Sequence, residues 1–186
     1  MSPPDSAPRT LRTYLESHEV ELIACTPDGT GHPHATIPTP AGWIPVPNKV
    51  FPHAYAVLVA PEDTENEWTP NAVLLHGRLS RWRPTDELLR IAASECRSLP
   101  DWSELHCDTD DFDSHRSVVT RGIYHVDDAW FDATTRFLVV DAEYDRYLTQ
   151  LTVTTHAHPE ARPASDTSTI HNGLTVVLDM PRRADR

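Results

Sequence analysis

The feature that most constrains the fold of this chain is a succession of short runs that have the character of β-strands. Residues 71–82 show it most clearly, because Val73, Leu75 and Leu79 alternate with side chains that would point to the opposite face of a strand. Such alternation is typical of β-structure. The other strand-like runs span residues 20–26, 33–37, 54–60, 117–131, 136–141, 147–155 and 174–179.

Two segments carry a helical pattern instead. Residues 10–18 place Leu11, Tyr14 and Leu15 at helical spacing. A second helix is expected from Thr85, which is followed by two acids and then by apolar residues, until Leu99-Pro100 ends it. Strands outnumber helices and no repeated βαβ alternation occurs, so the order of elements favours an antiparallel barrel or sandwich with accessory helices over a doubly wound nucleotide fold.

Proline and composition set the domain limits. The chain has 17 prolines and only 6 glycines, and the five prolines within residues 38–52 exclude that segment from a central strand, leaving an edge strand or a structured loop. We expect residues 1–9 to be a flexible tail and residues 10–155 to form one β-barrel-like domain. Residues 156–186 are expected to be a connector loop followed by a C-terminal strand and a basic tail.

The charge of the chain excludes one class of partner. The formal net charge is −12, with 28 acids against 16 bases, and Lys49 is the only lysine. An acidic surface of this kind repels phosphate backbones, so nucleic-acid binding is not expected. The composition is typical of a bacterium with an acidic proteome.

Two features that the sequence lacks bear on the location of the protein. No apolar run approaches the ~20 residues that span a bilayer, and the N-terminus has no basic segment followed by an apolar core. Cys25, Cys96 and Cys107 are an odd number and too few for a disulfide framework. These observations predict a cytoplasmic protein with free thiols and no membrane association.

Histidines and cysteines suggest two kinds of metal site. The pairs His32/His34 and His156/His158 have the i, i+2 spacing that places both side chains on one face of a strand, although ordinary surface histidines explain them as well. A structural zinc site is the second hypothesis, and it competes with a buried free thiol at Cys96. Its ligands would be Cys96, His106, Cys107 and His115.

Three segments resemble a known family. A strand followed by a T-P-D-G turn and a second strand is similar to the first hairpin of the FMN-binding split-barrel superfamily, which includes pyridoxamine-phosphate-oxidase-like and haem-utilisation-like proteins. The residues that carry this likeness are Thr26, Pro27, Asp28, Gly29, Pro33 and His34. Residues 73–79 and 124–130 resemble two later strands of the family, so the resemblance covers residues 10–140.

The resemblance implies a mostly β (α+β) fold, namely an antiparallel split β-barrel-like domain with two or three short accessory helices. It also implies a small molecule or planar cofactor, FMN or haem, and a possible flavin-dependent oxidoreductase whose redox chemistry belongs to the cofactor. Residues 60–67 are acidic and lack the family's lysine, so arginines would have to hold the flavin phosphate. The implied cofactor-binding residues are His34, Thr36, Trp43, His76, Arg78, Arg81, Trp82 and Arg83.

For haem, the iron ligand would be His34, His76 or His125. No catalytic residue is identified, because no complete set such as G-x-S-x-G is present. Whether the chain is an enzyme therefore stays open. The alternative function is a non-enzymatic β-rich interaction or accessory protein with an acidic surface, which would bind a protein partner and no cofactor. A homodimer is compatible with either function.

Overall fold

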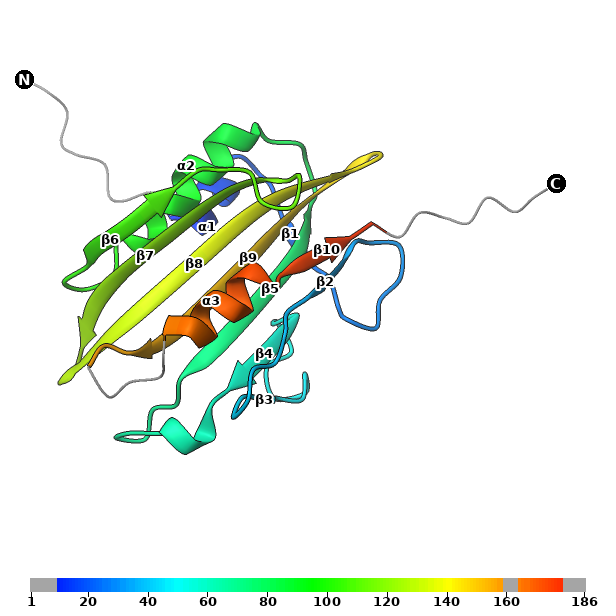
Figure 1. Cartoon of the computed structure of the whole chain (residues 1–186). Helices are drawn as coiled ribbons and strands as arrows, with labels where there is room; N and C mark the ends of the chain where they lie inside the picture. The colour runs from blue at the N-terminus through cyan, green and yellow to red at the C-terminus, as the bar shows by residue number, and fades with distance from the viewer. Residues whose placement is uncertain (1–9, 159–163, 179–186) are drawn as a thin grey trace, which may run out of the picture.

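The computed structural model describes residues 10–158 and 164–178, and its centre is one antiparallel sheet of eight strands (Figure 1). The strands run, in sheet order, through β3 (Ile44–Pro45), β4 (Ala56–Val59), β5 (Asn71–Leu79), β9 (Asp145–His156), β8 (Ala129–Ala142), β7 (Arg116–Val126) and β6 (Ser103–Asp108). The eighth strand, β1 (Leu22–Ala24), pairs with the end of β5 at Gly77–Leu79. A separate two-stranded sheet joins β2 (His34–Thr36) to β10 (Thr175–Val177).

Helices cover both faces of this sheet. Two of them, α1 (Leu11–Ser17) and α2 (Thr85–Cys96), pack on one face, while α3 (Ala164–Asn172) crosses the other (Figure 1). A 3₁₀ turn, η1 (Pro61–Asp63), follows β4. None of the helices in the described part of the chain is long and apolar enough to cross a membrane.

The two long central strands supply both hydrophobic cores. Along β8, Phe137 and Val139 contribute to the core beneath α1 and α2, while Leu138 and Val140 contribute to the core beneath α3. Successive side chains of a strand point to opposite faces, so one continuous apolar run serves two layers. Solvent is largely excluded from both cores at these positions, since each of the four side chains is at most 3% exposed.

Residues that favour the start of a helix stand at the beginning of α1 and of α2. The Thr10 side chain accepts a hydrogen bond from the Thr13 amide and caps α1. In α2 the capping position belongs to Pro84 rather than to Thr85, and Asp86 and Glu87 lie in the first turn, where their charges favour the helix dipole.

A close backbone approach holds β1 against the sheet. A Cβ atom built at Gly77 would lie 2.9 Å from Leu22 Cδ1 and 3.0 Å from the Ile23 carbonyl oxygen. Gly77 therefore leaves the space that β1 occupies beside β5. This pairing continues past β1, because the Cys25 amide donates to the His76 carbonyl over 2.9 Å.

Both predicted helices, the edge position of β3 and the mostly β, antiparallel character of the chain are confirmed. The barrel is not: among the described residues the sheet has two free ends, β3 and β6, and does not close. The predicted hairpin is also wrong. The turn forms, with Gly29 donating to the Thr26 carbonyl over 2.9 Å, but β1 then pairs with β5 and β2 with β10.

Three further boundaries differ from the sequence prediction. Residues 117–131 are two strands, β7 and β8, joined by a turn at Asp127, whose φ is +49°. Residues 103–108, which lie outside all the strand-like runs of the sequence, form the edge strand β6. The connector expected after residue 155 contains α3, and the predicted tails at 1–9 and 179–186 lie outside the described residues.

Burial of His171, which lies on α3, should make the stability of the fold depend on pH. Burial, and then the charge of Arg136, lower the pKa of His171 from 6.5 to about 4. As pH falls from about 6.5 to about 4 the unfolded chain binds the proton first, so the free energy of unfolding should fall by an amount on the order of 3 kcal/mol from this group.

The measurement is urea unfolding of the wild type and of His171→Gln across this pH range. The variant cannot titrate at this position, so its stability should fall less steeply. Equal pH slopes in the two proteins would show that His171 does not contribute.

Candidate functional site

A hollow of the described surface, named here the α1 groove, lies between α1 and the edge of the sheet and has a volume of about 700 Å³. This size lies within the range of small-molecule sites. Its apolar lining comes from Leu11, Leu15, Val20, Leu22, Ala24 and Leu75. Leu22, one of these lining residues, is 39% exposed, so part of the apolar lining is in contact with solvent.

The charged residues that line the α1 groove are mainly acidic. Glu16, Glu21 and Glu95 line it, against the single cation of Arg12. Burial raises the pKa of Glu95, and the Leu11 backbone amide and the Arg12 charge offset this in part. The groove is thus lined by both apolar side chains and carboxylates.

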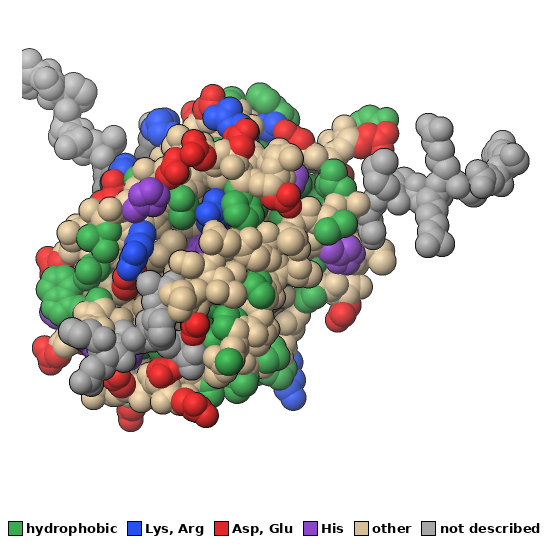
Figure 2. All heavy atoms as spheres, in the orientation of Figure 1, with side chains coloured by type: hydrophobic (Ala, Val, Ile, Leu, Met, Phe, Trp, Pro, Cys, Tyr) green, Lys and Arg blue, Asp and Glu red, His purple; other side chains and the backbone are tan. Residues whose placement is uncertain are grey.

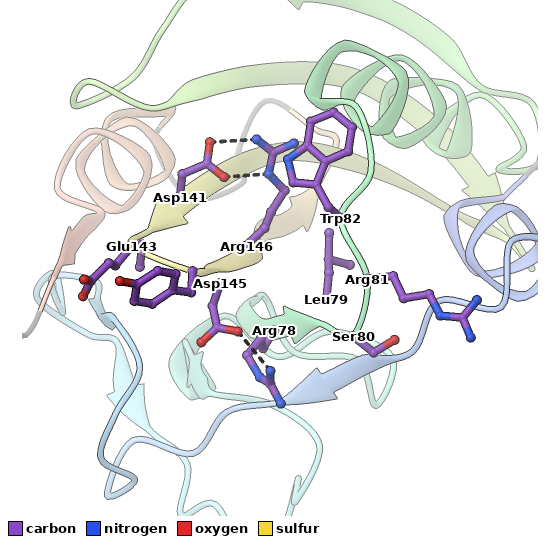
Figure 3. A pocket seen from close by; sticks show the side chains of 11 residues that line it. Arg78, Leu79, Ser80, Arg81, Trp82, Asp141, Glu143, Asp145 and Arg146 are labelled. Carbon is purple, nitrogen blue, oxygen red and sulfur yellow. Dashed lines mark hydrogen bonds and ion pairs between the residues drawn. The ribbon is translucent and has the colours of Figure 1, made fainter.

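A second hollow of about 390 Å³, the turn cleft, lies where the β8–β9 turn meets the end of β5 (Figure 3). Arg146, whose side chain is 9% exposed, donates to both oxygens of Asp141 over 2.6 and 2.8 Å. It also donates to the Arg83 carbonyl and stacks over the Trp82 ring at 4.8 Å. Arg146 therefore ties the β8–β9 turn to the segment that leads into α2.

The arginines that the sequence assigned to a flavin phosphate are each paired with a carboxylate. Arg78 binds Asp145 over 3.0 Å, and Arg81, which points away from the turn cleft in Figure 3, binds Glu19 over 3.1 Å. A phosphate would have to displace these partners, and Asp141, Glu143 and Asp145 add negative charge to the same cleft.

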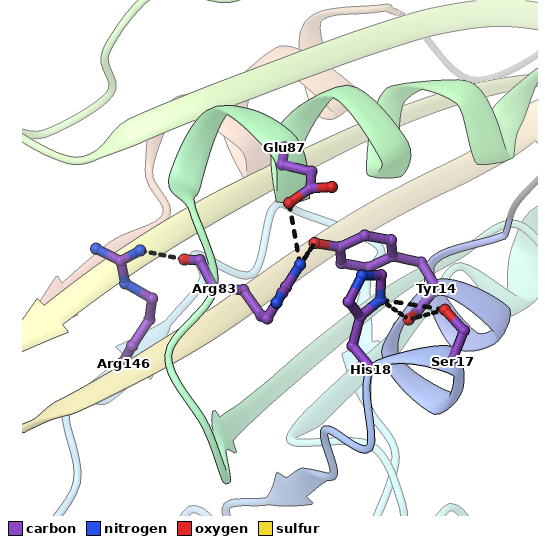
Figure 4. Close-up of polar contacts among 6 residues, drawn as sticks. All are labelled: Tyr14, Ser17, His18, Arg83, Glu87 and Arg146. Atoms are coloured by element: carbon purple, nitrogen blue, oxygen red, sulfur yellow. Dashed lines mark hydrogen bonds and ion pairs between the residues drawn. The ribbon is translucent and has the colours of Figure 1, made fainter.

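The guanidinium of Arg83 is occupied by a separate network (Figure 4). It donates to the Tyr14 hydroxyl over 2.8 and 2.9 Å and to Glu87 over 3.2 Å. This network joins α1 to the start of α2. The Tyr14 side chain at its centre is 1% exposed.

The remaining predicted cofactor residues lie elsewhere. The turn cleft is lined by Arg78, Arg81 and Trp82 but by none of the other five. Thr36 bonds to Thr175 across the β2–β10 pair over 2.7 Å, and Trp43 is 3% exposed and donates to Asp166 over 3.1 Å. The structure thus distributes the eight residues over several surroundings instead of around one planar ligand.

Two of the histidines proposed as haem ligands, His76 and His125, lie in different surroundings. His76 is 4% exposed and stacks on Tyr147, with ring centroids 5.4 Å apart. Burial, followed by the charge of His32, lowers the pKa of His76 to about 4, so its imidazole is neutral near pH 7. His125 instead lies on β7 beside Trp130 at 4.7 Å.

The four residues of the zinc hypothesis are not brought together. Cys96 is buried, accepts a hydrogen bond from Thr120 over 3.2 Å, and has its pKa raised by burial, whereas Cys107 is exposed on β6. In the part of the chain that the structure describes, two other groups have ligand atoms close enough to share an ion. They are Cys25, His32 and His76, and Glu65, His156 and His158.

Comparison with known proteins identifies the family. The family model described as "Probable lipoprotein LpqN" matches residues 7–177. The chain belongs to the LpqN lipoprotein family. Two curated relatives are a proline-rich 28 kDa antigen of Mycobacterium tuberculosis, 29% identical over 168 residues, and its homologue in Mycobacterium leprae, 27% identical over 167 residues.

Each comparison covers about 90% of this chain but 54% and 60% of those two relatives, so the chain spans little more than half of their length. The "Putative lipoprotein LpqT" of Mycobacterium tuberculosis is 28% identical over 173 residues, which are 91% of this chain and 74% of LpqT. A crystal structure of LpqN, described as involved in cell envelope biogenesis of Mycobacterium tuberculosis, superposes with a TM-score of 0.77 at 16% identity, covering 91% of this chain and 98% of that one.

These comparisons correct three predictions. The chain is a member of the LpqN family and not of the FMN-binding split-barrel superfamily. The prediction of a flavin or haem oxidoreductase rested on that resemblance and is therefore wrong. The alternative, a non-enzymatic interaction or accessory protein, agrees better with these comparisons. The cytoplasmic prediction is contradicted by relatives that are named lipoproteins.

Arg146 offers a test of how the turn cleft is held together. Arg146→Ala removes a largely buried guanidinium from Asp141, the Arg83 carbonyl and the Trp82 ring, so the free energy of unfolding should fall by about 2–3 kcal/mol. The matched control is Arg81→Ala, whose ion pair is exposed on both sides and should contribute at most about 1 kcal/mol. Equal losses in urea unfolding would contradict this assignment.

Proposed function

We propose that this protein is a non-enzymatic accessory protein of the cell envelope that holds an apolar or amphiphilic small molecule in the α1 groove. The observation that carries the envelope part is the family match over residues 7–177, which is supported by the LpqT relatives and the fold shared with LpqN. The proposal that the protein holds a small molecule depends on the volume and lining of the α1 groove.

The α1 groove has the properties of a site for an apolar group. Six aliphatic side chains line it, and transfer of an alkyl chain from water onto them contributes about 0.8 kcal/mol for each buried methylene. Its acidic lining residues and the net charge of −12 favour a neutral or cationic head group over an anionic one. A neutral amphiphile fits both features.

The titrating groups near the groove and on the neighbouring face support binding rather than catalysis. Burial raises the pKa of Cys25, so its thiol is not an activated nucleophile in the protein as it stands. The Cys96 thiol is buried and bonded to Thr120. Neither thiol has the activated character that nucleophilic catalysis requires.

Filling the α1 groove tests its role directly. Ala24 is an exposed residue of the groove wall, so Ala24→Trp should fill the cavity without altering the core, and L105W, at an exposed position of β6 outside the groove, is the control. The probe is N-phenyl-1-naphthylamine, a neutral apolar dye whose fluorescence rises on leaving water.

We expect saturable binding of one dye per chain by the wild type and by L105W. In A24W the affinity should fall at least about tenfold, since roughly 1.4 kcal/mol of apolar contact is enough to produce that change. Unchanged binding by A24W, or no saturable binding by the wild type, would contradict the groove as a ligand site.

A further inference from the structure

Three side chains from separate segments converge where the chain after β1 meets β5. Cys25 follows β1, His32 lies in the loop between β1 and β2, and His76 lies on β5. Their potential ligand atoms all lie within 4.8 Å of one another. The backbone bond from the Cys25 amide to the His76 carbonyl, 2.9 Å long, holds two of the three in register.

His76 presents an unpaired nitrogen. Its side chain is 4% exposed, its Nδ1 lies 2.8 Å from Thr149 Oγ1, and its Nε2 is buried without a hydrogen-bond partner, although the Pro33 carbonyl lies close by. Leaving a buried polar atom without a partner destabilises the fold. With Nδ1 protonated and bonded to Thr149, the Nε2 atom carries the lone pair that a metal ion binds.

The His32 ring is held close to this nitrogen. Its Nδ1 lies 2.8 Å from the Pro33 carbonyl oxygen and its Nε2 lies 3.0 Å from that of Thr26. A neutral imidazole has one N–H, so one of these nitrogens turns its lone pair toward a carbonyl. The loop is shaped around the ring, since a Cβ atom at Gly29 would lie 2.8 Å from His32 Nε2.

The cluster is reached from solvent through a hollow of about 380 Å³. Cys25 and His32 line this hollow, together with Arg78, Asp145 and Tyr147. An ion bound by Cys25, His32 and His76 would therefore keep one coordination position facing an open space. Three protein ligands and one open position are the arrangement of zinc sites that bind water or a further ligand.

We propose that Cys25, His32 and His76 bind one zinc-class divalent cation. One thiolate and two imidazoles are the ligand set that such borderline-soft ions prefer over Mg²⁺ or Ca²⁺. Zn–N bonds of about 2.0–2.1 Å and Zn–S bonds of about 2.3 Å place the ligand atoms of a tetrahedral site within about 4 Å of one another, so a contraction of roughly 1 Å closes the site. Binding releases the thiol proton of Cys25 to solvent.

The second group, Glu65, His156 and His158, is the weaker candidate. Its Glu65 and His158 are exposed and already bonded to each other over 3.1 Å, and it contains no thiol. The presence or absence of a sulfur ligand therefore separates the two sites experimentally.

The test is titration of the reduced full-length protein with Co²⁺, which replaces Zn²⁺ and shows a near-ultraviolet charge-transfer band only when a thiolate is bound. We expect this band in the wild type, and its loss in Cys25→Ser. The matched control is Cys107→Ser, which removes an exposed thiol on β6 and should keep the band. Added Zn²⁺ should abolish the band in both proteins that show it.

A second variant keeps the test independent of the cysteine. His32→Gln should weaken Zn²⁺ binding, measured by calorimetry, at least about tenfold, while His158→Gln should leave it unchanged. Far-ultraviolet circular dichroism establishes that each variant is folded. No band in the wild type, a band that survives in C25S, or a band lost in C107S would overturn the proposal. None of these outcomes depends on dye binding in the α1 groove.

Discussion

The structure depends on the burial of both faces of its central strands. Neighbouring residues of β8, such as Phe137 and Leu138, enter different cores. The strand β9 also contributes to both cores, through Leu148 and Leu151. A slip of one residue between these strands would exchange the two cores, so their register is strongly fixed. The helices follow from this constraint, since α1 and α2 cover one face and α3 the other (Figure 1). Residues of β5 contribute to both candidate sites.

Local patterns in the sequence were sufficient for the elements but not for their partners. The helices α1 and α2 and the strand β5 follow from spacing, capping residues and alternation, which are properties of short segments. The hairpin prediction failed because β1 and β2 each find a better partner far along the chain, in β5 and β10. The helix α3 was missed because its sequence, ASDTSTIHN, has few apolar residues, and Ile170 is held by the sheet rather than by a helical pattern.

The sequence alone did not reveal the candidate sites, because they too depend on contacts between segments that are distant in the chain. Arg78 and Arg81 do line a cleft, and Arg83 belongs to a separate network. Pairing of these three arginines with Asp145, Glu19 and Glu87 removes the free positive charge that a phosphate site needs. Their partners are distant in the sequence except for Glu87. Likewise, Cys25 and His76 meet only because β1 pairs with β5, and the α1 groove forms only where α1 lies over the same two strands. Figure 2 shows acidic side chains around the rim of the α3 face, which agrees with the charge of the whole chain.

We propose that this member of the LpqN family acts by binding in the cell envelope and not by flavin or haem chemistry in the cytoplasm. The most direct measurement is fractionation of the organism that encodes it, with the protein detected by a C-terminal epitope tag and with cytosolic and membrane marker proteins as controls. The account predicts that the tagged protein is recovered with the envelope and shows no flavin or Soret absorbance after purification. Recovery only with the cytosolic marker, in a coloured form, would contradict it.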